Sequence, residues 1–378
     1  IIFCITVCIV FMFAYYQNLR KEISVRQEWL ETVLTREKKW ILENQGPEGE
    51  IYMNGSKAGD VNPYFACMAA LGLLAETKNC PMTETEQKAV GRYLDWHTGV
   101  LLETDGKMGI YRKEGGELIY KEKADSEDGY LGMYLFLMGK YLEKTESTDL
   151  PESWKNGISL ALKKIQSLMQ DGITQVSEEN TTAYLMDNLE VWKGLYELEH
   201  AGLKDVQAIS EMRNKLQAQI EKLFWDDANQ RWRIIENSDL YHQKEFYPDG
   251  VAQIYPLIYE FPVKEKKKQK ILYEQFTEKF QWQKLNKKRN GFLWAMTGMA
   301  AAQMGDINNL LELIRNYETE YCENRKYPLY TGEAGWICME CEKLYSLYEK
   351  NKNRIFGLTG LPAFCKLLQN IKYVLFRQ

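Results

Sequence analysis

The chain has 378 residues, of which 45% are hydrophobic and 13% are aromatic, and its formal net charge is −5 at pH 7. This hydrophobic content excludes a disordered chain, and the length allows one large domain or two ordinary ones. Acidic and basic residues are mixed along the sequence, so nothing indicates a nucleic-acid partner, and the basic run at 264–270 reads as the solvated start of a helix.

The first segment, Ile1–Tyr16, is apolar, and the first charge in the chain is Arg20. A membrane-spanning helix needs roughly 20 apolar residues, and no small-residue cleavage site follows this run. We therefore predict a transmembrane signal anchor over residues 1–19; a cleaved signal peptide and a buried helix are the alternatives. Lys21 and Arg26 add to a charge bias that favours a body inside the cell.

Residues 24–350 are predicted to form twelve helices in six consecutive pairs. The first helix of each pair is amphipathic and charged, whereas the second is apolar on nearly every face and must therefore be buried on every face. This alternation predicts an all-α fold, an (α/α)6 toroid with an inner ring of helices inside an outer ring. The expected pairs are 25–44 with 62–76, 85–102 with 126–143, 152–169 with 182–200, 206–225 with 248–260, 266–281 with 291–305, and 307–323 with 333–348.

Three connections within pairs carry turn and strand signals, and they are 46–59, 104–120 and 226–235. We expect them to form short β-hairpins or loops at one end of the barrel. Residues 351–378 are expected to form a C-terminal extension, which either packs on the barrel or lies on the membrane.

The densest polar cluster, 124–130, opens the second inner helix and contains Asp125, Glu127 and Asp128. Asp125 or Ser126 can cap this helix, and acidic residues at its start complement the helix dipole. Three acids within four positions exceed what capping needs, and their mutual repulsion raises the pKa of at least one carboxyl group. A raised carboxyl pKa is the property that a general acid requires.

Two further polar clusters lie at the start of inner helices. Asp187 and Glu190 share one face of the third inner helix, whereas Asp249 opens the fourth and Gln253 follows one turn later. A structural hydrogen-bond network between helices explains Asp187 and Glu190 equally well. Helix capping is the alternative explanation for Asp249. The leading candidates for acid/base catalysis are Asp125, Asp128 and Asp187, with Glu127, Glu190 and Asp249 in reserve.

Aromatic residues recur at the start of the inner helices. With 24 Tyr and 10 Trp, the chain fits a cleft that stacks on the flat faces of sugar rings, although core packing explains many of these residues. The expected substrate-binding residues are Tyr64, Tyr130, Trp192, Tyr247, Trp294 and Trp336, together with the polar Gln253.

Other chemistries have little support in the sequence. His97, His200 and His242 have no metal-ligand spacing and no neighbouring Ser or Cys nucleophile signal. The pair Cys338 and Cys341 has no second CxxC and no nearby His, and no Gly-rich phosphate loop is present. We expect no metal and no cofactor.

Several pieces of the chain resemble the six-hairpin glycosidase superfamily, in particular its membrane-anchored branch linked to bacterial polysaccharide synthesis. These pieces are NPYFACMAALGLL, ADSEDGYLGMYLFLMGKYLE, YLMDNLEVWKGL, YPDGVAQIYPLIY and GFLWAMTGMAAAQMGD, within residues 28–348. The resemblance implies the toroid and a carbohydrate ligand. It does not determine the reaction, because the superfamily contains hydrolases, lyases, epimerases and phosphorylases. Ser126-Glu127 and Gly132-Met133 also resemble the acid motif of family 8 glycoside hydrolases, with Asp128 in place of its Gly.

We therefore predict a membrane-anchored glycoside hydrolase that acts on a polysaccharide or oligosaccharide. One carboxyl group would protonate the glycosidic oxygen and another would activate water. The alternatives are a non-catalytic glycan-binding or scaffold component of an exopolysaccharide assembly system, and a polysaccharide lyase. The expected partners are the carbohydrate, the membrane and the polysaccharide-synthesis machinery. Because a polymer substrate is met at the cell surface, we expect a single-pass protein of the cell membrane whose body lies outside the cytoplasmic membrane.

Overall fold

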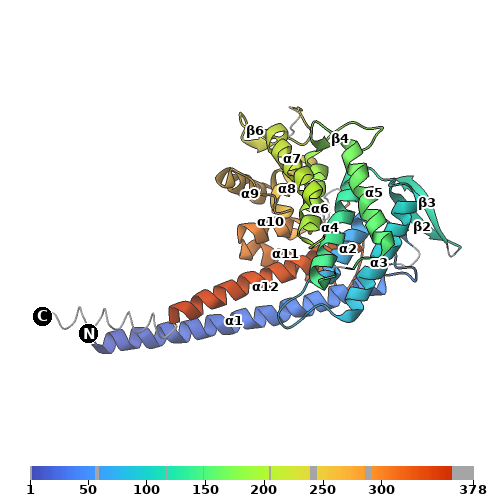
Figure 1. Ribbon diagram of the computed structural model, residues 1–378. Coiled ribbons are helices and arrows are strands. Elements are labelled where there is room, and N and C mark those ends of the chain that lie inside the picture. Colours follow the sequence, from blue (N-terminus) through green and yellow to red (C-terminus); the bar gives the residue numbers. More distant parts are fainter. Residues whose placement is uncertain are drawn as a thin grey trace.

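The computed structural model describes residues 2–55, 59–115, 117–147, 149–203, 206–238, 245–285 and 291–359, with the backbone alone for residues 2–13, 16, 113 and 353–359. The described residues contain twelve α-helices that alternate between an outer and an inner ring (Figure 1). The outer helices are α1 Ile2–Glu43, α3 Glu84–Glu103, α5 Glu152–Leu168, α7 Gln207–Phe224, α9 Lys266–Phe280 and α11 Ile307–Tyr321. The inner helices are α2 Pro63–Leu74, α4 Glu127–Thr145, α6 Leu185–His200, α8 Val251–Ile258, α10 Thr297–Met304 and α12 Thr331–Thr359.

The inner helices form a closed ring. Each packs against the next, and α12 packs against α2. Glycines allow close crossings, since a Cβ on Gly132 of α4 would lie 2.7 Å from the backbone nitrogen of Val191 in α6. A Cβ on Gly72 of α2 would likewise lie 2.4 Å from the Cα of Gly335 in α12. The ring therefore depends on backbones that touch directly.

The longest helices, α1 and α12, run side by side out of the body of the protein (Figure 1). Gln27 donates to Glu349 across this pair at 2.8 Å. Helix α12 continues to Thr359, beyond the predicted end at residue 348, and residues 360–378 of the predicted extension lie outside the described residues.

The predicted anchor and the first outer helix form a single helix, because residues 2–43 contain neither Gly nor Pro to break it. Among the helices with described side chains, none is both long and apolar enough to cross a membrane. The predicted anchor, residues 1–19, lies mostly outside those side chains, which begin at Ala14.

Seven short strands form three small antiparallel sheets in the described structure. The predicted segment 104–120 contains most of a hairpin, and 226–235 contains most of another, whereas 46–59 contributes one bridge between Gln45 and Ile51. A third hairpin was missed, although its Asp171-Gly172 turn, with φ of 52° and 88°, carries a hairpin signal. The sheets are β1 Asp60–Val61 with β2 Gly109–Glu114 and β3 Glu117–Lys123, β4 Met169–Gln170 with β5 Ile173–Thr174, and β6 Trp225–Asp226 with β7 Arg231–Trp232.

The fifth inner helix begins later than predicted, at Thr297 instead of residue 291. Gly291 and Trp294 have φ of 75° and 59°, in the left-handed region, so residues 291–296 cannot continue a right-handed helix. Phe292, Trp294 and Met296 therefore lie in a non-helical turn before α10.

Candidate active site

A cavity of about 290 Å³ lies at the end of the ring where the inner helices begin. All six inner helices, or the residues directly before them, contribute to its wall. The cavity therefore forms only when the inner ring is closed. The lining residues are Asn62, Tyr64, Phe65, Met68, Asp125, Ser126, Tyr130, Met186, Asp187, Glu190, Tyr247, Tyr255, Phe292, Trp294, Met296, Glu333 and Trp336.

Asp187, in the first turn of α6, lies in the wall of this cavity. Burial raises the pKa of its carboxyl group well above the usual range, and the neighbouring acids Asp128, Glu190 and Asp125 raise it further. A raised pKa favours the protonated form of the carboxyl group. Asp187 is therefore suited to donate a proton to a ligand in the cavity.

Asp125 is exposed at the rim of the same cavity, directly before the cap of α4. Ser126 caps that helix by accepting from the backbone N–H of Gly129 at 3.2 Å. Because α4 and α6 are neighbours in the ring, their first turns bring Asp125 and Asp187 to one cavity. The site thus combines an acid that is open to solvent with an acid that is partly buried.

Glu190 lies in the same cavity one helical turn beyond Asp187. Its Oε1 accepts hydrogen bonds from the hydroxyls of Tyr64, of Tyr255 at 2.6 Å and of Tyr259 at 3.3 Å. Burial raises the pKa of Glu190 to about 7, and the tyrosine hydrogen bonds oppose this rise. Its charge therefore changes near neutral pH.

Glu333, in the first turn of α12, also lines the cavity, although it is not among the candidates predicted from the sequence. Its two carboxylate oxygens accept the backbone N–H groups of Trp294 at 3.2 Å and Ala295 at 2.8 Å. Burial raises its pKa to about 7. Glu333 thus stabilises the left-handed backbone of Trp294. The sequence signal that could have identified Glu333 is its position near Trp336 at the start of an inner helix.

Aromatic rings form much of the cavity wall. The rings of Tyr64 and Tyr130 have centroids 5.5 Å apart, and those of Tyr247 and Trp294 are 4.8 Å apart. Within the described structure, the buried indole N–H groups of Trp294 and Trp336 have no hydrogen-bond partner. Flat apolar surfaces with free donors beside them suit a ring that carries hydroxyl groups.

Two predicted catalytic residues at the start of α4 lie outside the cavity lining. Asp128 is buried and accepts hydrogen bonds from Ser126 at 2.8 Å and from Thr174 of β5 at 2.7 Å. Burial raises its pKa to about 6. Glu127 forms an ion pair with Lys123 at 3.2 Å. The hydrogen bonds and the ion pair of these two acids are made with neighbouring protein groups.

Three predicted residues on α6 and near α8 also lie outside the lining. Asp249 is buried. Trp192 stacks on Tyr196 at 5.3 Å, on the side of α6 that packs against the protein interior. Gln253 accepts from the backbone N–H of Trp232 at 2.9 Å and donates to its carbonyl at 2.9 Å, so it ties β7 to α8.

Of the predicted site residues, the cavity brings together Asp125, Asp187, Glu190, Tyr64, Tyr130, Tyr247, Trp294 and Trp336. In the part of the chain that the structure describes, no three or more His, Cys, Asp and Glu residues are placed to hold a metal ion. The chemistry offered by the described residues is that of carboxyl and hydroxyl groups.

Solved structures share this fold. A glycosidase variant in complex with glucose matches with a TM-score of 0.60 at 12% identity, over 86% of this chain and 99% of its own. An alpha-amylase from Clostridium perfringens matches with 0.54 at 13% identity, over 83% and 97%. A sugar epimerase from a ruminal bacterium matches with 0.53 at 10% identity, over 84% and 98%.

No protein-family model matches the sequence, and no curated protein is significantly similar to it. The structural matches confirm the predicted (α/α)6 toroid and the fold of six-hairpin glycosidases. At identities this low they establish the fold alone, because one fold hosts many reactions.

Proposed function

We propose that this protein is a carbohydrate-active enzyme that hydrolyses a glycosidic bond through Asp187 and Asp125. The observation that carries the proposal is one aromatic-walled cavity with two acids. One has a pKa well above its usual range, and the other is exposed to solvent directly before the neighbouring helix. The fold likeness to glycosidases and a sugar epimerase supports a sugar ligand.

In the proposed reaction, Asp187 gives its proton to the glycosidic oxygen as the bond from that oxygen to the anomeric carbon breaks. Asp125 accepts a proton from the water that attacks the anomeric carbon, so the products are two free hydroxyl groups and the catalytic protons balance. Tyr130, Tyr247 and Trp294 form the walls against the sugar ring. Glu190, Tyr64 and Tyr255 hydrogen-bond the ring hydroxyls.

A non-catalytic glycan-binding or scaffold protein is the second candidate. One observation favours it, namely that two of the cavity acids already serve internal partners. Glu190 accepts three tyrosine hydroxyls, and both oxygens of Glu333 accept backbone N–H groups. A binding protein needs only such positioned polar groups and aromatic walls, without an acid pair that acts on the bond.

Product analysis distinguishes these functions. The purified protein is incubated with the surface polysaccharide of its own organism, and products are separated by size and identified by mass spectrometry. Hydrolysis adds one water to each cleaved bond, whereas a lyase would release an unsaturated sugar and a binding protein would leave the polymer intact. Saturated fragments that appear with the wild type but not with Asp187→Asn are the expected result.

We also propose that the chain is tethered to the membrane, with its body outside the cytoplasm. The apolar sequence Ile1–Tyr16 and the continuous helix α1, which extends away from the body, support this proposal (Figure 1). Arg20, Lys21 and Arg26 would then contact anionic headgroups, at about 1 kcal/mol each. Protease added to intact cells should degrade the body; a body that is protected until the membrane is broken would contradict this placement.

A further inference from the structure

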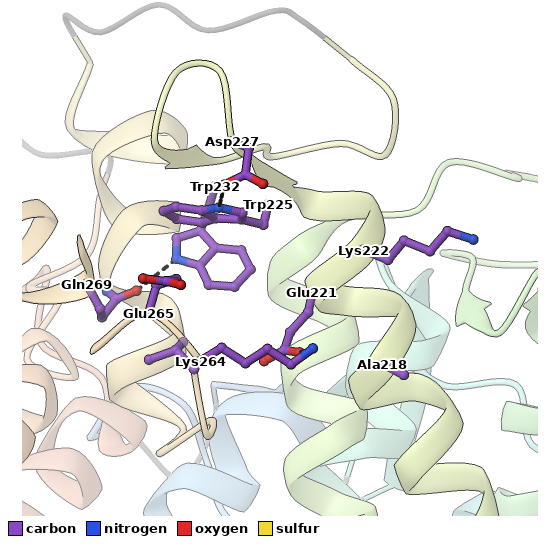
Figure 2. A pocket seen from close by; sticks show the side chains of 10 residues that line it. Ala218, Glu221, Lys222, Trp225, Asp227, Trp232, Lys264, Glu265 and Gln269 are labelled. Atoms are coloured by element: carbon purple, nitrogen blue, oxygen red, sulfur yellow. Dashed lines mark hydrogen bonds and ion pairs between the residues drawn. The ribbon is translucent and has the colours of Figure 1, made fainter. Parts of the chain in front are cut away.

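A second cavity, of about 260 Å³, lies on the outer wall of the ring, between α7 and the start of α9 (Figure 2). None of its lining residues belongs to the central cavity. Two indoles, of Trp225 and Trp232, lie above the charged side chains of Glu221, Lys264 and Glu265 in the view of Figure 2. The proposed reaction does not involve this pocket.

The two indoles are held in place by the protein itself. Their ring centroids are 5.1 Å apart at an interplanar angle of 71°. Trp225 donates from Nε1 to Asp227 at 2.9 Å, and Trp232 donates from Nε1 to Gln269 at 2.8 Å. Gln253 also binds both backbone polar groups of Trp232. The aromatic wall is thus ordered before any ligand arrives, which lowers the entropy cost of binding.

Glu221 lines this pocket and has one carboxylate oxygen without a hydrogen-bond partner among the described residues. Its side chain is only 10% exposed, and it forms an ion pair with Lys264 through Oε2. Its other oxygen, Oε1, is buried and has no hydrogen-bond partner among the described residues. A buried carboxylate oxygen without a donor is costly, so a ligand hydroxyl that donates to Oε1 would recover a substantial free energy.

The charges around the pocket balance each other. Glu221 pairs with Lys264, and Lys268 lies 3.5 Å from Asp227 and 3.9 Å from Glu265. A charged ligand would have to compete with these existing pairs. A neutral ring with apolar faces and hydroxyl groups at its edge matches both the indoles and the free acceptor.

We propose that this pocket is a second, non-catalytic binding site for one ring of a neutral saccharide. The choice of a saccharide rests on the proposed function, whereas the site itself does not depend on catalysis in the central cavity. A polymer bound by this pocket would be held on the outer wall while another part of it enters the ring. The pocket would therefore raise the local concentration of polymer at the enzyme.

The test uses the full chain with Asp187→Asn, so that no probe is hydrolysed during the measurement. Isothermal titration calorimetry is run with neutral tetrasaccharides of glucose and of mannose, and with tetragalacturonate as the charged probe. Glu221→Met keeps the size of the side chain and removes both acceptors. Glu211→Met, at an exposed position of the same helix, is the matched control.

We expect Glu221→Met to weaken neutral-saccharide binding at one site by about tenfold or more, since a hydrogen bond to a charged group is lost. Glu211→Met should bind like the parent. Trp225→Ala should also abolish saccharide binding at this site. Trp225→Phe keeps a flat ring and should retain part of the binding. It also controls for folding, because it changes the same position.

The proposal is overturned if Glu221→Met leaves the binding of both neutral probes unchanged. It is also overturned if tetragalacturonate binds this pocket more tightly than the neutral probes do. Failure of the proposed function gives a different result. In that case wild-type protein releases no products, while the calorimetric difference between Glu221→Met and Glu211→Met remains.

Discussion

At the scale of single residues, the four acids that line the central cavity differ in what surrounds them. Glu190 is held by three tyrosine hydroxyls, and Glu333 by two backbone N–H groups. Asp125 is open to solvent, whereas Asp187 lies among other acids that disfavour its ionisation. These surroundings are the basis for the proposal that Asp187 donates the proton and Asp125 acts on water.

Asp187→Asn should lower kcat for glycan hydrolysis by about 10²–10⁴-fold, because an amide of the same shape cannot donate the proton. Asp149→Asn, at an exposed position outside the cavity, is the matched control and should keep the wild-type rate. The measurement is the rate of reducing-end release from a confirmed substrate. An Asp187→Asn variant as fast as the control would show that Asp187 is not the acid.

Stability should depend on pH through Glu190 and Glu333, whose pKa values rise from 4.5 to about 7 on folding. The folded state then binds more protons than the unfolded state between these values, so the free energy of unfolding should fall as pH rises from about 4.5 to about 7. Urea unfolding across this range measures the slope. Glu333→Gln should flatten it and should cost about 1–3 kcal/mol, because one backbone N–H loses its acceptor.

At the scale of elements, the twelve helices were predictable because amphipathic, charged segments alternate with segments that are apolar on nearly every face. The start of α10 was not predictable in the same way. Trp294 has a left-handed backbone conformation, and its N–H donates to the distant Glu333, a contact that leaves no local pattern in the sequence. The Asp171-Gly172 hairpin did carry a local signal and could have been recognised.

The crossing of α4 and α6 gives a prediction about packing. Gly132→Ala should destabilise the protein by about 1–3 kcal/mol, because its Cβ would lie 2.7 Å from the backbone nitrogen of Val191. Gly99→Ala, in the outer helix α3, should stabilise it by up to about 1 kcal/mol, because no atom lies within 4 Å of the added Cβ. Chemical denaturation of both variants measures the difference. Equal effects would mean that close backbone contact does not limit this crossing.

At the scale of the whole molecule, the alternation of charged and apolar helices predicted both the closed ring and the end of it where polar residues gather. It did not predict which acids face the cavity. Asp125 and Asp128 are three positions apart, yet only Asp125 lines it, because Asp128 is bound by Thr174 from a strand far along the chain. Helix rotation of this kind depends on tertiary contacts that one sequence does not display.

Ring closure joins the first hairpin to the last, and Gly335 lies at that junction. A Cβ on Gly335 would lie 2.1 Å from the backbone oxygen of Met68, so Gly335→Ala must push α12 away from α2. Because Met68 and Trp336 line the central cavity, the same shift should weaken ligand binding there.

Hydrogen exchange measures this effect directly. Amide protection in α2 and α12 should fall in Gly335→Ala, while α5 and α7, on other hairpins, should keep their protection, and Gly99→Ala serves as the control for a tolerated substitution. Unchanged protection in α2 and α12 would show that the ring does not rely on this contact. A uniform loss over all helices would show instead that the ring opens only when the whole domain unfolds, since α12 contacts α1, α2, α10 and α11 at once.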